Sequence, residues 1–156
     1  MMLSLIDAGS SPYSIRYGDG CGYYRDDGER LAPNVAFVFR DDAEIWVIDT
    51  WYLRARPALI ILEAHRWAKT LQQVAEFLTT DLNIPGPYHW IAGYEGVAGR
   101  KLNISDQMGR TWGPCADNII EKDGKFSFGK NAEEVLQKFF REIYEQCGAP
   151  VSQPRV

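Results

Sequence analysis

The chain contains few cysteines and few histidines. Its 156 residues include two His, His65 and His89, and three Cys: Cys21, Cys115 and Cys147. The cysteine count is odd, the spacings are long and no CxxC pair occurs, which is unlike a disulfide scaffold or a zinc site. Neither histidine lies in a metal-binding motif such as HExxH. We therefore expect free thiols, no metal and no cofactor.

Long apolar stretches are also missing. The longest runs, residues 35–39 and 58–62, are too short for a helix that spans a bilayer. The N-terminal residues 1–7 have neither the basic n-region nor the apolar h-region of a signal peptide. We therefore expect a cytoplasmic protein without a membrane segment.

An excess of positive charge is absent as well. The formal net charge is −4, which argues against a protein whose main task is to bind phosphate backbones nonspecifically. Acidic residues outnumber basic ones in residues 1–50, and the balance reverses in residues 51–101. This distribution leaves room for a local basic face, but not for a generally basic surface.

Aromatic residues, in contrast, are abundant. They make up 13% of the chain and include five Trp and eight Tyr, so the rings must pack in a core, line a pocket or lie at an interface. Hydrophobic residues at 46% and charged residues at 24% are ordinary for a globular protein. The length fits one domain, which we expect over residues 1–150, followed by a frayed tail over 151–156.

The first half of the chain carries β-strand signals. Tyr13–Tyr17 and Gly22–Arg25 are short strand candidates between turn-forming Gly and Asp residues. Val35–Arg40 and Glu44–Thr50 flank the short turn Asp41-Asp42-Ala43 and predict a β-hairpin. Both of these strands are apolar on both faces, so we expect them in the centre of a sheet rather than at its edge.

Two segments have the periodicity of amphipathic helices. Over about residues 57–82, with Pro57 in the first turn, apolar residues recur at steps of three and four: Ile60, Ala64, Trp67, Leu71, Val74, Leu78 and Leu82. Over about residues 132–147 a second apolar stripe follows Asn131, with Glu134 at the reciprocal position of a capping box. We expect one helix in each segment.

The region between the helices is again rich in strand signals. Residues 88–93 and 100–104 are strand candidates, and residues 118–128 predict a second hairpin around the Asp123-Gly124 turn. The order of elements predicts an α+β fold, with an antiparallel-dominated sheet and the two helices packed on it.

Two glycine-spaced segments invite a ligand-binding interpretation. Gly18–Gly22 leads into a strand-like run and lacks Gly-Lys-Ser/Thr, so we interpret it as a turn rather than a phosphate loop. Gly93–Gly99 either forms tight turns between two strands or closes on a ligand. If it closes on a ligand, the candidate ligand-binding residues are Tyr94, Glu95, Arg100 and Lys101, with Arg110 and Trp112 from the next polar segment.

The sequence shows no complete catalytic constellation. Asp49 lies at the end of an apolar strand, where it either caps the next segment, pairs with an arginine such as Arg54, or acts as an acid or base if burial raises its pKa. Cys115 is either an ordinary loop thiol or a nucleophile, whereas Cys147 lies on the apolar stripe of a helix and is expected to pack in the core.

Several stretches share features with one bacterial family: Ala36–Thr50, Pro87–Leu102, Gly113–Cys115, Phe139–Phe140 and Cys147–Gly148. They resemble the C-terminal portion of proteins that carry a Schlafen-type AlbA_2 DNA-binding domain. The acidic E…EFK segment and the AFANSxGG run of that domain are not found in the chain. The resemblance therefore implies an accessory module, and it places no nucleic-acid site and no catalytic residue here.

We expect a non-enzymatic binding module that contacts a partner protein, or a second copy of the chain, in a nucleic-acid-related or regulatory system. The alternative is a small-molecule-binding or enzymatic domain with a pocket near Gly93–Gly99. In that alternative, Glu95 or Asp49 is the acid–base group and Arg100 binds an anion. A third hypothesis is direct nucleic-acid binding through Arg100, Lys101 and Arg110.

Overall fold

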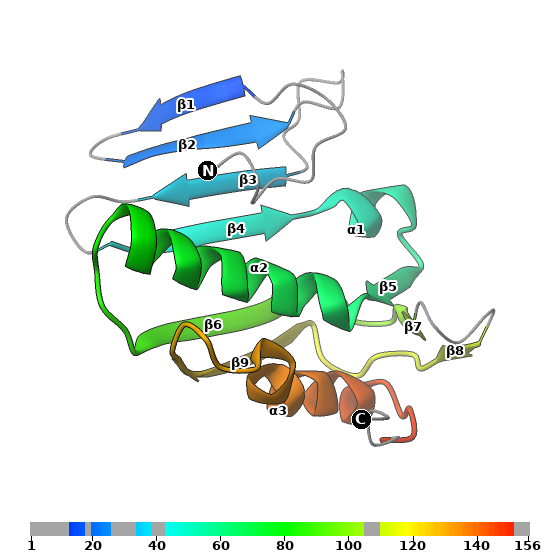
Figure 1. Ribbon diagram of the computed structural model, residues 1–156. Helices are drawn as coiled ribbons and strands as arrows, with labels where there is room; N and C mark the ends of the chain where they lie inside the picture. Colours follow the sequence, from blue (N-terminus) through cyan, green and yellow to red (C-terminus); the bar gives the residue numbers. More distant parts are fainter. Residues whose placement is uncertain (1–12, 18–19, 26–33, 39–42, 105–109, 152–156) are drawn as a thin grey trace.

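A computed structural model describes residues 13–17, 20–25, 34–38, 43–104 and 110–151 (Figure 1). The Gly18-Asp19 and Asp41-Asp42 turns, most of the polar loop after Ile104 and the expected tail after Val151 lie outside the described residues. Within them, helices and strands coexist, and antiparallel pairings dominate, so the predicted α+β class is confirmed. The strands form three sheets rather than one.

The N-terminal sheet has four strands in sequence order, each antiparallel to the next: β1 (Tyr13–Tyr17), β2 (Gly20–Arg25), β3 (Asn34–Val38) and β4 (Ile45–Asp49). The two short strands and the hairpin that the sequence predicts are therefore confirmed. The central position predicted for the second hairpin strand is wrong, because β4 is the last strand in the order of the described sheet. The apolar residues on the two faces of β4 are therefore mostly exposed, and not buried as predicted.

The helix predicted over about residues 57–82 begins later than expected. A short helix α1 (Trp51–Ala55) is followed by a strand β5 (Leu59–Leu62), and α2 (Ala64–Glu76) continues into a π-helical turn η2 (Phe77–Asp81). The four residues of β5 are all apolar and pair in parallel with β7 (Lys101–Ile104), which buries Ile60 and Leu62. Such a run satisfies helical and strand patterns equally, and the parallel pairing decides between them. The short strand β8 (Thr111–Trp112) completes this sheet.

The third sheet pairs β6 (Tyr88–Glu95) with β9 (Ile119–Phe126) along their full length. The hairpin predicted around Asp123-Gly124 is wrong, because both residues lie inside the continuous strand β9. Gly124 faces Trp90 of β6, and a Cβ atom on Gly124 would come within 2.9 Å of the indole ring. The glycine is therefore needed for close packing and not for a turn.

The C-terminal helix α3 (Ala132–Gln146) is confirmed with its predicted cap. The Asn131 side-chain oxygen accepts hydrogen bonds from the backbone N–H groups of Glu133 at 3.0 Å and Glu134 at 3.4 Å. Two of the four free N–H groups at the start of the helix are thereby satisfied.

The two long helices lie on the same side of the strands, with α2 in front of β4 and β6 and α3 beside β9 (Figure 1). An ion pair of 2.8 Å between Lys122 of β9 and Glu142 of α3 helps to fix the second helix on its strand. The main core lies between the helices and the strands, and its fully buried larger side chains include Ile60, Leu102, Ile120, Phe126, Leu136, Phe139 and Ile143.

Candidate functional site

The first residues of the Gly93–Gly99 segment end strand β6, and residues 96–100 form the connection between β6 and β7. Gly96 and Gly99 have φ angles of +76° and +77°, a backbone region that glycine adopts without a steric penalty. The Arg100 side chain closes this loop, because its Nε donates a hydrogen bond of 2.7 Å to the Gly96 carbonyl and its NH1 donates one of 2.8 Å to the Leu53 carbonyl of α1. The segment is therefore a turn between strands, as one of the two interpretations predicted, and Arg100 anchors it to α1.

The six predicted ligand-binding residues have different surroundings. Tyr94 and Glu95 are consecutive strand residues and point to opposite faces of β6, with Tyr94 on the face that carries the core. Lys101 and Arg110 are exposed, whereas Trp112 is half-buried against the core. Trp112 pairs with Leu102, which places it in the β5–β7–β8 sheet beside Lys101.

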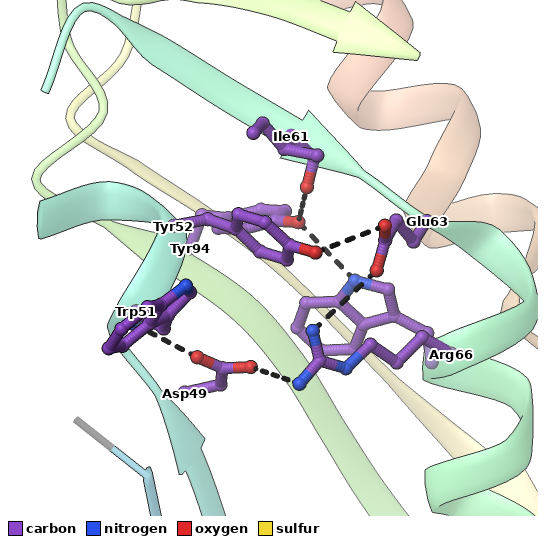
Figure 2. Close-up of polar contacts among 8 residues, drawn as sticks. Asp49, Trp51, Tyr52, Ile61, Glu63, Arg66 and Tyr94 are labelled. Carbon is purple, nitrogen blue, oxygen red and sulfur yellow. Dashed lines mark hydrogen bonds and ion pairs between the residues drawn. The ribbon is translucent and has the colours of Figure 1, made fainter. Parts of the chain in front are cut away.

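A polar network joins the end of β4 to the start of α2 (Figure 2). One carboxylate oxygen of Asp49 lies 2.9 Å from a guanidinium nitrogen of Arg66, and the other accepts a hydrogen bond of 2.9 Å from the backbone N–H of Trp51. Arg66 also lies 3.6 Å from a carboxylate oxygen of Glu63. Of the predicted roles, pairing with an arginine is seen, with Arg66. The N-cap residue of α1 is Thr50, and Asp49 contacts the N–H of the first helical residue from the position before it.

Tyr52 of α1 extends this network. Its hydroxyl donates a hydrogen bond of 3.2 Å to Glu63, and the Arg66 guanidinium lies 5.6 Å from the centroid of its ring. Burial raises the pKa of Tyr52, and the negative charge of Glu63 raises it further. The Tyr52 hydroxyl is therefore held in its neutral form, in which it acts as a hydrogen-bond donor.

Tyr94 lies on the inner side of the same region. Its hydroxyl donates a hydrogen bond of 3.1 Å to the Ile61 carbonyl of β5 and accepts one of 3.3 Å from the indole Nε1 of Trp67 in α2. The rings of Trp67 and Phe139 meet edge to face at 4.9 Å, and Tyr94 stacks on Phe139 at 6.1 Å. Burial raises the pKa of Tyr94 strongly, so its hydroxyl stays protonated. Tyr94 therefore connects β5, β6, α2 and α3 through internal contacts.

Only part of this polar network can be predicted from the sequence. Arg66 of α2 follows the N-cap residue Glu63 by three positions, so their proximity follows from spacing alone. The pair between Asp49 and Arg66 spans two elements and depends on how α2 lies against β4. Chemically, the network places two carboxylates around one guanidinium and directs the Tyr52 hydroxyl to one of them. This arrangement is suited to holding β4, α1 and α2 together.

Large apolar residues are exposed in β4 and α1, and we name three of them the β4–α1 surface: Trp46, Ile48 and Trp51. Their exposed fractions are 52%, 45% and 47%. Trp46 and Ile48 are two residues apart on a strand, so they share one face of β4. Sequence reasoning noted the apolar residues of this strand but expected them to be buried.

Other exposed apolar residues lie in more polar surroundings. Ile91 of β6 is paired with Asp123, and Ile119 of β9 is paired with Glu95. Single exposed apolar residues of this kind are common on protein surfaces, whereas a contiguous group marks an interaction site more often. The β4–α1 surface is therefore the stronger candidate for contact with another molecule.

Within the described ranges, no three His, Cys, Asp or Glu side chains are grouped in a way that could hold a metal ion. None of the described helices is long and apolar enough to cross a bilayer.

Comparisons of the chain with protein-family models, with curated proteins and with solved structures gave no significant match.

Proposed function

We propose that this chain is a non-enzymatic interaction module of the cytoplasm, and that it binds a partner protein through the β4–α1 surface. The observation that carries the proposal is the exposure of Trp46, Ile48 and Trp51 within a stretch of six residues. Tryptophan is enriched among the residues that dominate binding energy at protein interfaces, where its truncation to Ala often costs about 2 kcal/mol or more.

The acidic residues that flank β4 favour a protein partner over a nucleic acid. Glu44 is exposed at the start of β4, and Asp49 ends the strand with its carboxylate directed to Arg66. Arg66 is thereby engaged by Asp49 and Glu63, so the nearest base in the network already has carboxylate partners. An apolar surface with acidic neighbours suits an apolar protein surface with a basic rim.

The contacts of the predicted loop residues are the reason for preferring this surface over a pocket at Gly93–Gly99. Tyr94 directs its hydroxyl to Ile61 and Trp67, and Arg100 directs two of its donors to backbone carbonyls. Groups used in this way stabilise the fold and are less accessible to a ligand.

The resemblance to the C-terminal portion of AlbA_2-type proteins suggests where the partner is to be sought. In this proposal the chain is an accessory module, and the partner surface belongs to a protein that acts in the same nucleic-acid-related or regulatory system. The chain itself then supplies the docking surface and leaves chemistry or nucleic-acid contact to its partner.

The proposal is tested by comparing two double variants with the wild type. Trp46→Ala with Ile48→Ser alters the β4–α1 surface, and Ile91→Ser with Ile119→Ser alters equally exposed residues elsewhere. Each tagged protein is used to capture partners, and the captured partner is then purified and its Kd for all three proteins is measured by calorimetry. Circular dichroism and thermal unfolding confirm that both variants remain folded.

We expect the Trp46/Ile48 variant to bind at least about 30-fold more weakly, which corresponds to about 2 kcal/mol, and the Ile91/Ile119 variant to bind as the wild type does. Sedimentation of the pure wild type distinguishes a second copy of the chain as the partner, because the same double variant then shifts a dimer to a monomer. Equal binding by all three proteins would rule out the β4–α1 surface.

A further inference from the structure

Two of the three cysteines lie next to each other in the core. Cys115 lies in the connection between β8 and β9, and Cys147 is the residue that follows α3. The backbone N–H of Ala116 donates a hydrogen bond of 3.1 Å to the carbonyl of Gln146, so the residue after Cys115 contacts the residue before Cys147. The Cys115 thiol donates a hydrogen bond of 3.6 Å to the Asp117 carbonyl, and its proximity to Cys147 contributes to raising the pKa of the Cys147 thiol.

Both thiols are free and buried. The exposed fractions are 3% for Cys115 and 1% for Cys147. The residues around Cys115 in the chain, from Gly113 to Asn118, are otherwise all exposed. Cys115 therefore lies in a connection at the protein surface, whereas Cys147 lies at the end of α3.

We propose that Cys115 and Cys147 form an intramolecular disulfide when the protein is exposed to a peroxide. The pair would then be a redox-sensitive cross-link between the β8–β9 connection and the end of α3. The proposal does not depend on the function proposed for the β4–α1 surface.

The reaction balances with a peroxide as the only oxidant. The Cys115 thiol loses its proton, and its sulfur attacks one peroxide oxygen, which gives a sulfenic acid and one molecule of water. The sulfur of Cys147 then attacks the sulfenic sulfur, and the departing hydroxide takes the Cys147 proton as a second molecule of water. Two thiols and one hydrogen peroxide thus give one disulfide and two waters, and a small thiol reverses the change.

The surroundings of the two thiols differ, and this difference decides which thiol reacts in the first step and which in the second. Burial raises the pKa of Cys147 to about 12, and the neighbouring Cys115 adds to the increase. Cys147 therefore keeps its proton at neutral pH and reacts poorly with a peroxide, which leaves it for the second step, beside a sulfenic sulfur that has already formed. Cys115, beneath the exposed connection, is the sulfur that a peroxide reaches first.

The backbone of Cys115 connects the proposed cross-link to the loop between β6 and β7. The N–H of Cys115 donates a hydrogen bond of 2.7 Å to the Arg100 carbonyl, and its carbonyl accepts one of 3.0 Å from the Gly99 N–H. Arg100 in turn contacts the Leu53 carbonyl of α1. A disulfide that restrains Cys115 should therefore also restrain the loop between β6 and β7.

The experiment treats the wild type and three variants with hydrogen peroxide and follows them by intact mass and peptide mapping. Cys21→Ser leaves only the proposed pair, and Cys21→Ser with Cys115→Ser or with Cys147→Ser leaves a single thiol. In the Cys21→Ser protein we expect a mass loss of about 2 Da, a cross-linked peptide containing both cysteines, and full recovery with a reducing thiol. A cross-link should raise Tm by several degrees, because it restricts the unfolded chain.

Cys21 of the wild type, which is half-buried in β2, provides an internal reference for exposure to the oxidant. The proposal fails if Cys21 is oxidised while Cys115 and Cys147 remain free thiols. It also fails if Cys115 gains the mass of a sulfinic or sulfonic acid without forming a cross-link to Cys147. Both readouts use the wild type, so they hold even if a serine variant does not fold.

Discussion

Asp49, the last residue of β4, forms an ion pair of 2.9 Å with Arg66 of α2 and simultaneously accepts a hydrogen bond from the backbone N–H of Trp51 (Figure 2). One carboxylate thus links the N-terminal sheet to α2 and fixes the chain at the point where β4 passes into α1. The side chains of both charged residues are about one-third exposed, so solvent weakens their attraction.

Replacement of Asp49 should separate these two effects. Asp49→Ala removes both contacts and should lower the free energy of unfolding by about 1–2 kcal/mol, whereas Asp49→Asn keeps an oxygen acceptor for Trp51 and should cost about half as much. Urea denaturation of the two variants measures the difference. Equal stability of wild type, Asn and Ala variants would show that the contacts contribute nothing.

Removal of the Tyr94 hydroxyl should destabilise the core. Tyr94→Phe deletes the donor to the Ile61 carbonyl and leaves the indole N–H of Trp67 without this acceptor, so we expect a loss of about 1–3 kcal/mol. Tyr52→Phe is the matched control, because its hydroxyl contacts a partly exposed carboxylate and should cost about 1 kcal/mol or less. The order of the two losses, measured by denaturation, is the test, and a larger loss for Tyr52→Phe contradicts the assignment.

The raised pKa of Tyr94 should make stability depend on alkaline pH. In the unfolded chain this tyrosine ionises near its ordinary pKa of 10.0, whereas in the folded protein it remains protonated to higher pH. The contribution is therefore fully present below about pH 10 and is lost progressively as the pH rises above that value. The stability difference between wild type and Tyr94→Phe should shrink between about pH 9 and pH 11, and a constant difference over that range contradicts the prediction.

Gly124→Ala should disturb the contact between β9 and β6. The new Cβ atom would lie 2.9–3.0 Å from three atoms of the buried Trp90 ring, and we expect a loss of about 1–3 kcal/mol from overpacking. Lys125→Ala, at the neighbouring exposed position of β9, should change the free energy of unfolding by less than about 0.5 kcal/mol.

A smaller side chain at position 90 provides a further control for this contact. If crowding is the cause, Trp90→Leu should cost less in the Gly124→Ala background than in the wild type, because the two residues share one space. Additive losses in the double variant would point to a cause other than contact between the two side chains.

The pair between His89 and Asp123 should be visible in the titration of the carboxylate. The ring Nε2 of His89 lies 2.8 Å from a carboxylate oxygen of Asp123, and this hydrogen bond lowers the pKa of Asp123 below its ordinary value. His89→Gln should move the pKa of Asp123 upward, as followed by NMR of the carboxyl carbon, while His65→Gln should leave it unchanged. An Asp123 pKa that is equal in wild type and His89→Gln would assign the lowering to another cause.

Several elements followed from the sequence because their signals are local. Asn131 and the apolar stripe after it define α3, since a cap and a 3.6-residue period depend only on nearby residues. The hairpin of β3 and β4 followed for the same reason, from two β-rich runs around a short turn. The glycine positions of the β6–β7 connection were also predicted as turns.

The predictions that the structure contradicts concern segments whose local sequence pattern fits two different structures. Leu59–Leu62 fits a helical stripe as well as a buried strand, and only its pairing with β7 makes it β5. Asp123-Gly124 fits a turn, but the continuous pairing of β9 with β6 and the Trp90 ring require a glycine within a strand. An apolar strand such as β4 fits either a sheet centre or an exposed edge, and the strand order decides.

By itself, then, the sequence determined the α+β class, the capped C-terminal helix and most of the strand segments, because these depend on propensities and periods over a few residues. Only the tertiary structure decided that Asp49 pairs with Arg66, that Cys115 lies against Cys147, and that Trp46 and Ile48 face solvent. Each of these relationships joins or exposes residues through the packing of separate elements, and no spacing in the sequence encodes that packing directly.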